Sequence, residues 1–281
     1  MPPRRLRLDA ELVRRGLARS REHAGELIAA GRVTVSGGRA TKAATGVTTD
    51  VAIVVAQDPD RPDYVSRGGH KLAGALAVFG AAGLQVAGRR CLDAGASTGG
   101  FTDVLLRAGA REVVAVDVGY GQLAWSLRSD ARVVVHDRTN IRDLTSEVVG
   151  GPVDLVVGDL SFISLTLVLE ALLGVTAGDG DLALMVKPQF EVGRNRVGKG
   201  GVVRDPELWV DAVATVAAAA ERRGWGTRMV TPSPLPGPSG NVEFFLWLRR
   251  GPSTLDPEER DDVVRAGVTD PPSVPGEKVD R

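Results

Sequence analysis

Short apolar runs that alternate with stretches of helical periodicity are the feature that most constrains the fold of this 281-residue chain. The runs are RRCLDAG, EVVAVDVG, RVVVHD, VDLVVGDL and DLALMVK. Nearly continuous apolar runs of this length are typical of strands buried on both faces of a parallel sheet. Helical stretches are expected at about 100–109, 121–128, 162–173 and 206–224. The alternation predicts an α/β domain with a doubly wound, mostly parallel sheet.

One further strand and a change of composition mark the end of this domain. The run NVEFFLWLRR predicts a last strand, so we expect the α/β domain to cover residues 66–250. From residue 251 the sequence becomes polar and proline-containing, and residues 256–281 hold eight Asp and Glu against four Lys and Arg. Such a composition buries little apolar surface, so a disordered acidic tail is expected over 251–281.

A small basic domain is expected at the N-terminus. Leu8, Leu12 and Val13 recur at helical spacing, and Ser20 is placed to cap a second helix that stops at Gly31. The alternating segment that follows turns at Ser36-Gly37-Gly38, as a β-hairpin does. Residues 1–42 contain ten Lys and Arg against four Asp and Glu, the charge expected where a domain contacts nucleic-acid phosphates. We expect this α+β domain over 1–57, followed by a linker over 58–65 that contains DPDRP.

The bulk composition narrows the class of protein. With 43% hydrophobic and 25% charged residues the chain is ordinary for a soluble globular protein. No apolar run approaches the ~18–20 residues of a membrane span, and the basic N-terminus lacks the apolar core of a secretory signal. The single cysteine, Cys91, suits a reducing compartment, so the cytoplasm is expected. The three histidines show no metal-ligand spacing, so no metal is expected.

A glycine-rich loop between the first strand of the α/β domain and a helix is the candidate cofactor site. Its residues are Asp93, Gly95, Ala96, Ser97, Thr98, Gly99, Gly100 and Phe101. Glycines let the backbone approach a ligand, and the helix N-terminus offers free N–H groups. The spacing differs from the G-x-G-x-x-G dinucleotide fingerprint.

Two acids end the next strands. Asp117 lies about twenty residues beyond the loop, where a carboxylate can accept hydrogen bonds from both ribose hydroxyls of a nucleoside cofactor. Asp137 ends the third strand and could either meet an adenine amino group or simply cap the strand.

Four charged residues stand where catalysis is expected. Asp159 and Lys187 end the fourth and fifth strands, and ligands of open α/β sheets bind outside these carboxyl ends. Lys71 precedes the first strand in SRGGHKL, and Glu243 begins the last strand in GNVEFF. Glu243 can reach the same edge only if that strand runs antiparallel to the others. Charged residues at the ends of otherwise apolar strands indicate a functional site.

Several of these segments resemble known families. LVRRGLARSREHAGELIAAGRVTVSGG resembles the S4 RNA-binding domain, and D-x-G-x-x-x-G-G-F resembles the S-adenosylmethionine motif of class I methyltransferases. The set of Lys71, Asp159, Lys187 and Glu243 resembles the catalytic tetrad of FtsJ-like ribose 2′-O-methyltransferases. Together with DVGYGQLAW, DLSFISL, KPQFE and PLPGPSGNVEFF, these motifs resemble the TlyA (hemolysin A) family over almost the whole chain to about residue 249.

The resemblance implies an activity and a set of site residues. The activity is S-adenosylmethionine-dependent 2′-O-methylation of cytidine in 16S and 23S ribosomal RNA by a monomer. Lys187 would be the general base and Asp159 its orienting partner, with Lys71 and Glu243 positioning the ribose. The cofactor would contact the glycine-rich loop together with Asp117, Val118 and Asp137. The RNA-binding candidates are Arg4, Arg7, Arg14, Arg15, Arg19, Ser20, Arg21 and Arg67.

Some alternatives remain open at this point. A pseudouridine synthase with an S4 domain would have no use for the cofactor loop, and an amino-directed base methyltransferase usually carries an N/D-P-P-Y/F turn where this chain has Asp159-Leu160-Ser161-Phe162. A pore-forming hemolysin, which the family's name suggests, would need a membrane-active segment that we do not find. A methyltransferase acting on another RNA also fits. Phe162 could stack on the target base or pack internally, and the basic loop 190–204 could contact RNA phosphates or only solvent.

Overall fold

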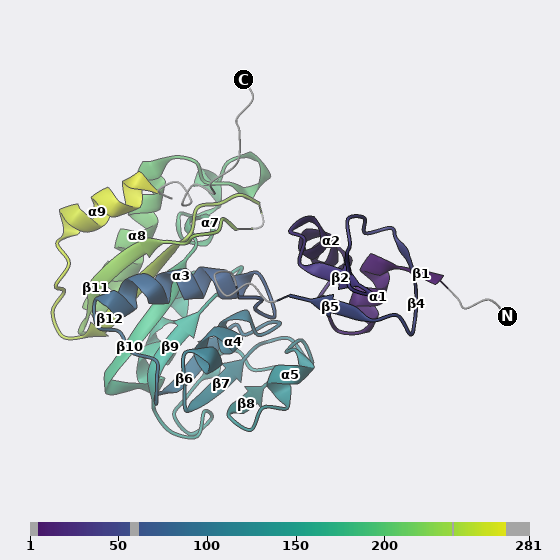
Figure 1. Cartoon of the computed structure of the whole chain (residues 1–281). Helices are drawn as coiled ribbons and strands as arrows, with labels where there is room; N and C mark the ends of the chain where they lie inside the picture. Colours follow the sequence, from purple (N-terminus) through teal and green to yellow (C-terminus); the bar gives the residue numbers. More distant parts are fainter. Residues whose placement is uncertain (1–4, 57–61, 238, 268–281) are drawn as a thin grey trace. The chain divides into compact units, whose positions relative to one another are not determined.

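The computed structural model describes residues 5–56, 62–237 and 239–267, and the chain divides into two compact units, 1–66 and 67–281 (Figure 1). Each unit has its own hydrophobic core.

The N-terminal unit combines short helices with short antiparallel strands. Its elements are β1 (Arg5–Arg7), α1 (Leu8–Arg14), α2 (Arg21–Ala29), β2 (Val33–Val35), β3 (Gly38–Arg39), β4 (Gly46–Thr48) and β5 (Ile53–Val55). β1 pairs with β4, and β2 lies between β3 and β5. The Ser20 side chain accepts a hydrogen bond from the His23 amide at 3.1 Å, so it caps α2 as expected. The expected hairpin is present, with Val35 opposite Gly38, and its two turn residues Ser36 and Gly37 both have positive φ.

The second unit is built on one twisted sheet of mostly parallel strands. In sheet order these are β11 (Trp225–Pro232), β12 (Phe244–Arg250), β10 (Thr176–Val186), β9 (Val153–Gly158), β6 (Arg90–Ala94), β7 (Glu112–Val116) and β8 (Val133–His136). The strands from β10 to β8 run parallel, whereas β12 runs antiparallel to both of its neighbours. This arrangement confirms the expected α/β fold class.

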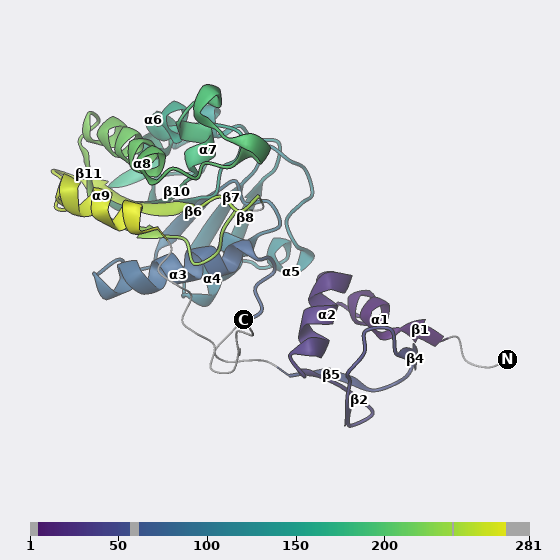
Figure 2. The ribbon, with the colours of Figure 1, turned by 90° about the horizontal axis from the view of Figure 1, so that it is seen from above.

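Helices cover both faces of this sheet. They are α3 (Gly68–Ala81), α4 (Gly100–Arg107), α5 (Trp125–Arg128), α6 (Leu169–Val175), α7 (Pro188–Glu191), α8 (Pro206–Glu221) and α9 (Pro257–Ala266), with short 3-10 turns η1 (Ile141–Asp143), η2 (Leu165–Leu167), η3 (Arg194–Arg196) and η4 (Lys199–Gly201). α6 and α8 lie on one face, and α3 and α4 lie on the other (Figure 2). Both faces of the central strands are therefore shielded from water, which explains their nearly continuous apolar sequence.

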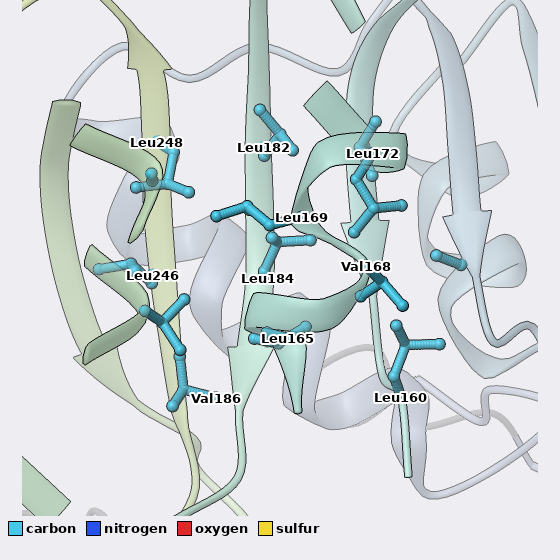
Figure 3. Close-up of a cluster of buried hydrophobic side chains, with 14 of the residues drawn as sticks. Leu160, Leu165, Val168, Leu169, Leu172, Leu182, Leu184, Val186, Leu246 and Leu248 are labelled. Atoms are coloured by element: carbon cyan, nitrogen blue, oxygen red, sulfur yellow. The ribbon is translucent and has the colours of Figure 1, made fainter. Parts of the chain in front are cut away.

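The largest core lies between the sheet and the α6–α8 layer. Leu165, Leu169 and Leu172 extend from η2 and α6 toward the leucines of β10 and β12 (Figure 3). Leu169 and Leu172 are fully buried, and burying one leucine contributes roughly 1.5–3 kcal/mol. This core fixes β9, β10 and β12 relative to one another, and Asp159, Lys187 and Glu243 directly adjoin these strands.

The expected disordered tail is wrong for its first part. Residues 257–266 form α9, which packs on α8 and β11. The Asp256 side chain caps this helix by accepting a hydrogen bond from the Glu258 amide at 2.8 Å. Val264 is fully buried and Val263 also packs against the core, so apolar contacts anchor a helix whose composition is otherwise acidic. Residues 268–281 lie outside the described part of the chain.

The expected linker is only partly described, since residues 57–61 fall outside the described ranges. Asp63, which we placed in the linker, is held by the N-terminal unit. Its carboxylate lies 2.5 Å from the Arg32 guanidinium and 3.4 Å from the His23 ring. Across residues 5–56, 62–237 and 239–267, no helix has the length and apolar character needed to cross a membrane.

Candidate active site

The four charged residues predicted as a catalytic set meet at one edge of the sheet. Asp159 directly follows β9 and Lys187 directly follows β10, at the carboxyl ends of these parallel strands. Glu243 directly precedes β12, which is antiparallel to β10 with Val186 opposite Phe244. Glu243 therefore reaches the same end of the sheet as Lys187, because the last strand is antiparallel and its start lies beside the end of β10.

Lys187 contacts two residues of the segment that follows β9. Its Nζ lies 2.5 Å from Asp159 Oδ1 and donates a hydrogen bond to Ser161 Oγ at 2.8 Å. The lysine is 7% exposed, so its charge is compensated by these neighbours more than by water. Ser161, two residues beyond Asp159 in DLSF, was not among the predicted site residues.

Lys71 and Glu243 form a second, more deeply buried pair. Lys71 Nζ, on α3, lies 2.5 Å from Glu243 Oε2, and the two residues are 6% and 1% exposed. The other oxygen, Oε1, is buried without a hydrogen-bond partner among the described residues. A Cβ at Gly237 would lie 2.5 Å from Oε1, so glycine lets the backbone approach this carboxylate. A buried acceptor left free at the end of the pair is available to a bound hydroxyl group.

A cavity of about 480 Å³ runs from the glycine-rich loop to Asp159. It is lined by Gly95, Ser97, Asp117, Val118, Gln122, Asn140, Ile141, Arg142, Asp159, Leu160, Ser161, Phe162, Ile163 and Val168. The Asp117 carboxylate accepts hydrogen bonds from the Ser97 amide at 2.8 Å and from the Gly119 amide at 2.7 Å. The size, the carboxylate and the apolar wall fit a nucleoside-containing cofactor.

A second cavity of about 550 Å³ shares Phe162 and Ile163 with the first. Its other walls include Gln189, Phe190 and Arg194. Phe162 is 91% exposed and has a φ of 65°, a conformation that bulky residues rarely adopt. Its ring centroid lies 5.4 Å from that of Phe190. The two cavities thus adjoin at an exposed aromatic side chain, next to Asp159.

Comparison with known proteins decides the family. The model of the FtsJ-like methyltransferases matches residues 64–250, and that of the S4 domain matches residues 6–53. A Mycobacterium tuberculosis protein named 16S/23S rRNA (cytidine-2′-O)-methyltransferase TlyA is 59% identical, covering 96% of this chain and 99% of its own. The chain belongs to the TlyA family of FtsJ-like methyltransferases.

Two other relatives agree with this TlyA-family membership. Hemolysin A of Brachyspira hyodysenteriae is 37% identical, over 85% of this chain and 98% of its own. The solved structure of a candidate hemolysin from Streptococcus thermophilus is 36% identical, with a TM-score of 0.70 and coverage of 94% of this chain and 95% of the other. The family therefore carries both names, and the domain content is that of a methyltransferase.

Some residues expected at the cofactor of this TlyA-family chain lie outside the lining of this cavity. Asp93 is fully buried in β6 and accepts a hydrogen bond from Thr102 Oγ1 at 2.7 Å. Phe101 is buried with its ring centroid 5.9 Å from that of Phe245. Neither residue lines the cavity, nor do Ala96, Thr98, Gly99 and Gly100. These residues shape the loop, and Gly95 and Ser97 are the loop members that face the cavity.

Asp137 is engaged by a neighbouring helix. Its Oδ2 lies 2.5 Å from the Arg128 guanidinium, which lowers the pKa of the carboxyl, and it does not line the cavity. Asn140, Ile141 and Arg142, a few residues further along, do line it. The segment after the third strand therefore borders the cavity through residues just beyond the predicted Asp137.

The predicted RNA-binding arginines differ in how far their side chains are exposed to solvent. Arg7 and Arg21 are about half exposed or more, at 51% and 60%, and both pair with Asp9 at 2.9 Å. Arg14 is 53% exposed, whereas Arg15 is 21% exposed and donates a hydrogen bond to the Val51 carbonyl at 2.7 Å. Arg15, the residue just after α1, therefore links that helix to the segment before β5.

The other candidates differ in what the structure shows of them. Arg19 lies 3.8 Å from Glu26, Ser20 is engaged in capping α2, and Arg67 is exposed just before α3. Arg4 lies outside the described residues.

Buried Glu11 accepts hydrogen bonds from both Arg14 and Arg15, and these guanidiniums lower the pKa of its carboxyl to about 2. In the described ranges no three His, Cys, Asp or Glu side chains gather as metal ligands do.

Proposed function

We propose that this chain transfers a methyl group from S-adenosylmethionine to the 2′-hydroxyl of a cytidine ribose in 16S ribosomal RNA, 23S ribosomal RNA or both. The observation that carries the proposal is the meeting of Lys71, Asp159, Lys187 and Glu243 at one sheet edge beside a cofactor-sized cavity. The substrate is that named for the Mycobacterium tuberculosis relative, which is 59% identical over nearly the whole chain.

S-adenosylmethionine fits the cavity between the glycine-rich loop and Asp159. Gly95 and Ser97 would contact its methionine part, and Asp117 would accept hydrogen bonds from its ribose hydroxyls. Asn140 and Ile141 line the part of the cavity contributed by the segment after β8, where we place the adenine; Asp137 would act there only if it leaves Arg128. When bound, the cofactor supplies an electrophilic methyl group.

The chain's own residues must align the hydroxyl and remove its proton. Lys187, in its neutral form, is the residue placed to accept that proton. Asp159 and Ser161 hold its Nζ from one side, at 2.5 Å and 2.8 Å. Lys71 orients Glu243, whose free Oε1 can accept a hydrogen bond from a ribose hydroxyl. Each lysine is thus paired with an acid, and one carboxylate oxygen, Glu243 Oε1, remains for the substrate.

The acceptor nucleotide would enter from the second cavity. Phe162 is exposed at the junction of the two cavities and can stack on an unpaired base, and Arg194 on the basic loop can pair with a phosphate. The basic N-terminal unit would supply affinity through its arginines. We place the reaction in the cytoplasm, with ribosomal RNA or ribosomal subunits as the partner and a monomer as the enzyme.

Transfer of labelled methyl from S-adenosylmethionine to purified 16S and 23S ribosomal RNA and to both ribosomal subunits tests this proposal. Lys187→Ala should lower single-turnover transfer by about 10²–10⁴-fold, the usual contribution of a general base, while cofactor affinity stays near that of the wild type. Lys187→Arg keeps the charge but cannot accept a proton, so it should be equally inactive. Full transfer by either variant would contradict the assignment of the base.

A further inference from the structure

Two segments that carry active-site residues lie side by side beyond the sheet edge. The segment after β9, residues 159–165, carries Asp159, Ser161 and Phe162. The segment after β10, residues 187–191, begins with Lys187 and forms α7. Lys187 joins the two through Asp159 and Ser161.

Glu191, at the end of α7, makes a second hydrogen-bonded connection between the same two segments. Its Oε2 accepts a hydrogen bond from Ser164 Oγ at 2.5 Å, and its Oε1 accepts one from the Leu165 amide at 2.8 Å. Ser164 is also the N-cap of η2, where its Oγ accepts from the Thr166 amide at 3.2 Å. The carboxylate therefore binds the start of η2 with both of its oxygens.

Burial makes this carboxylate unfavourable unless its contacts are kept. Desolvation raises the pKa of Glu191, and the hydrogen bonds from Ser164 and Leu165 oppose that shift. This half-buried acid is not needed to cap the 3-10 turn, since Ser164 already caps it. The geometry points to a role in holding the segment itself.

Phe162 lies in the chain between the residue bound by Lys187 and the residues bound by Glu191, and these contacts support its backbone conformation. Its backbone is in the left-handed region, which is unfavourable for a bulky side chain unless neighbours hold it there. Lys187 binds Ser161 on one side of Phe162, and Glu191 binds Ser164 and Leu165 on the other. Phe190, adjacent to Glu191, contacts the Phe162 ring.

We propose that Glu191 is a positioning residue that clamps the 159–165 segment against α7 and so fixes Asp159, Ser161 and Phe162 relative to Lys187. This inference rests on the proposed methyl transfer for its kinetic consequence. Glu191 lines neither of the two cavities, so it acts through Ser164 and Leu165.

Glu191→Ala and Glu191→Gln test the clamp in the full chain. The alanine variant should lower kcat for methyl transfer by at least about tenfold, as a misplaced reacting group does, while S-adenosylmethionine affinity stays within about threefold. The glutamine variant keeps one acceptor oxygen and should recover most of the rate. Hydrogen exchange should rise in Glu191→Ala within peptides that cover 160–168, because the Leu165 amide loses its acceptor.

Asp256→Ala is the matched control, since Asp256 also accepts an amide hydrogen bond at the start of a helix but lies on α9, which lines neither cavity. An equal fall of kcat in this control, or exchange that rises across the whole domain in Glu191→Ala, would mean a general stabilising role and overturn the inference. Full kcat in Glu191→Ala would overturn it too. If the wild type transfers no methyl, the proposed function fails, and unchanged exchange at 160–168 in Glu191→Ala would separately overturn the clamp.

Discussion

Single residues in the cofactor loop are constrained by backbone conformation and by the space around them. Gly99, at the N-terminus of α4, has a φ of 99°. A Cβ there would lie 2.3 Å from Leu127 Cδ1 and 2.8 Å from Leu123 Cδ1. These two leucines follow Asp117 in the chain, so any change at Gly99 displaces the side of the loop that faces the cofactor acid.

Gly99→Ala should therefore destabilise the fold and weaken cofactor binding together. Left-handed strain and overpacking together should cost about 2–4 kcal/mol of unfolding free energy. Gly224→Ala is the control: Gly224 also has a positive φ, of 78°, but nothing lies within 4 Å of its Cβ position. It should cost only about 1–2 kcal/mol and leave cofactor affinity unchanged. Denaturant unfolding measures the unfolding free energy of each variant, and cofactor titration measures its affinity. Equal cofactor affinity in the two variants would contradict the proposed effect of Gly99 on the cofactor loop.

Asp93 gives the loop a dependence on pH. Burial raises the pKa of this carboxyl to about 7, against the hydrogen bond from Thr102. The folded state thus binds the proton more tightly than the unfolded chain. The resulting stabilisation is complete below about pH 4 and is lost as the pH rises through about 7.

Asp93→Asn, which cannot ionise, should remove this dependence. The unfolding free energy of the wild type should fall relative to that of the variant between about pH 5 and about pH 8. Urea unfolding at both pH values gives the comparison. A difference between the two proteins that is independent of pH would show that Asp93 is already ionised throughout this range.

At the scale of elements, the sequence was most informative where strands are buried on both faces. The runs around β6, β7, β8, β9 and β10 were predicted because parallel central strands need continuous apolar sequence. β11 was missed because an edge strand is free of that requirement; WGTRMVTP is mixed and ends in proline, which edge positions tolerate. The helix α9 was missed because its composition is acidic and only Val264 is fully buried.

Val264→Ala should show whether α9 is a stable part of the domain. Removing two methyl groups from a fully buried position should lower the unfolding free energy by about 1–2.5 kcal/mol. Glu259→Ala, on the exposed side of the same helix, should change it by less than about 0.5 kcal/mol. Thermal or denaturant unfolding measures both. Equal effects would mean that α9 does not pack on α8 and β11 as described.

The members of the candidate site were predictable, but of the two ion pairs only that of Lys187 with Asp159 was expected, through the family resemblance. A charged residue at the end of an apolar strand is visible in the sequence, which is how Asp159 and Lys187 were found. The pairing of Lys71 with Glu243 depends on the position of α3 over the sheet, which no local pattern encodes. Ser161 and Glu191 look like ordinary loop and helix residues, and only the register of β9 and β10 reveals their contacts.

At the scale of the whole molecule, charge is divided between the units. The basic excess lies in residues 1–42, whereas the proposed chemistry lies in residues 67–281. The arginines of α1 and α2 differ in how far their removal disturbs the fold. Asp9 and Glu11 each pair with two arginines, so one partner of each can be removed while a pair remains.

Combining Arg14→Ala with Arg21→Ala should weaken RNA binding and leave cofactor affinity intact. The slope of log affinity against log salt concentration should become shallower by about 0.7–0.9 for each RNA phosphate that an arginine no longer neutralises. Arg265→Ala, on α9, is the control and should change neither quantity. Arg15→Ala should instead lower the melting temperature, because Arg15 holds the Val51 carbonyl. Unchanged RNA affinity in the double variant would contradict the proposed division of labour.

The position of the transferred methyl group distinguishes ribose methylation from base methylation. Ribosomal RNA that has been methylated by the purified protein is digested to nucleosides, and the labelled product is identified by mass spectrometry. We expect 2′-O-methylcytidine, formed by the wild type and absent with Lys187→Ala. A methyl group on a nucleobase would contradict it, because Lys71, Asp159, Lys187 and Glu243 would then serve a different acceptor from the ribose hydroxyl assigned to them.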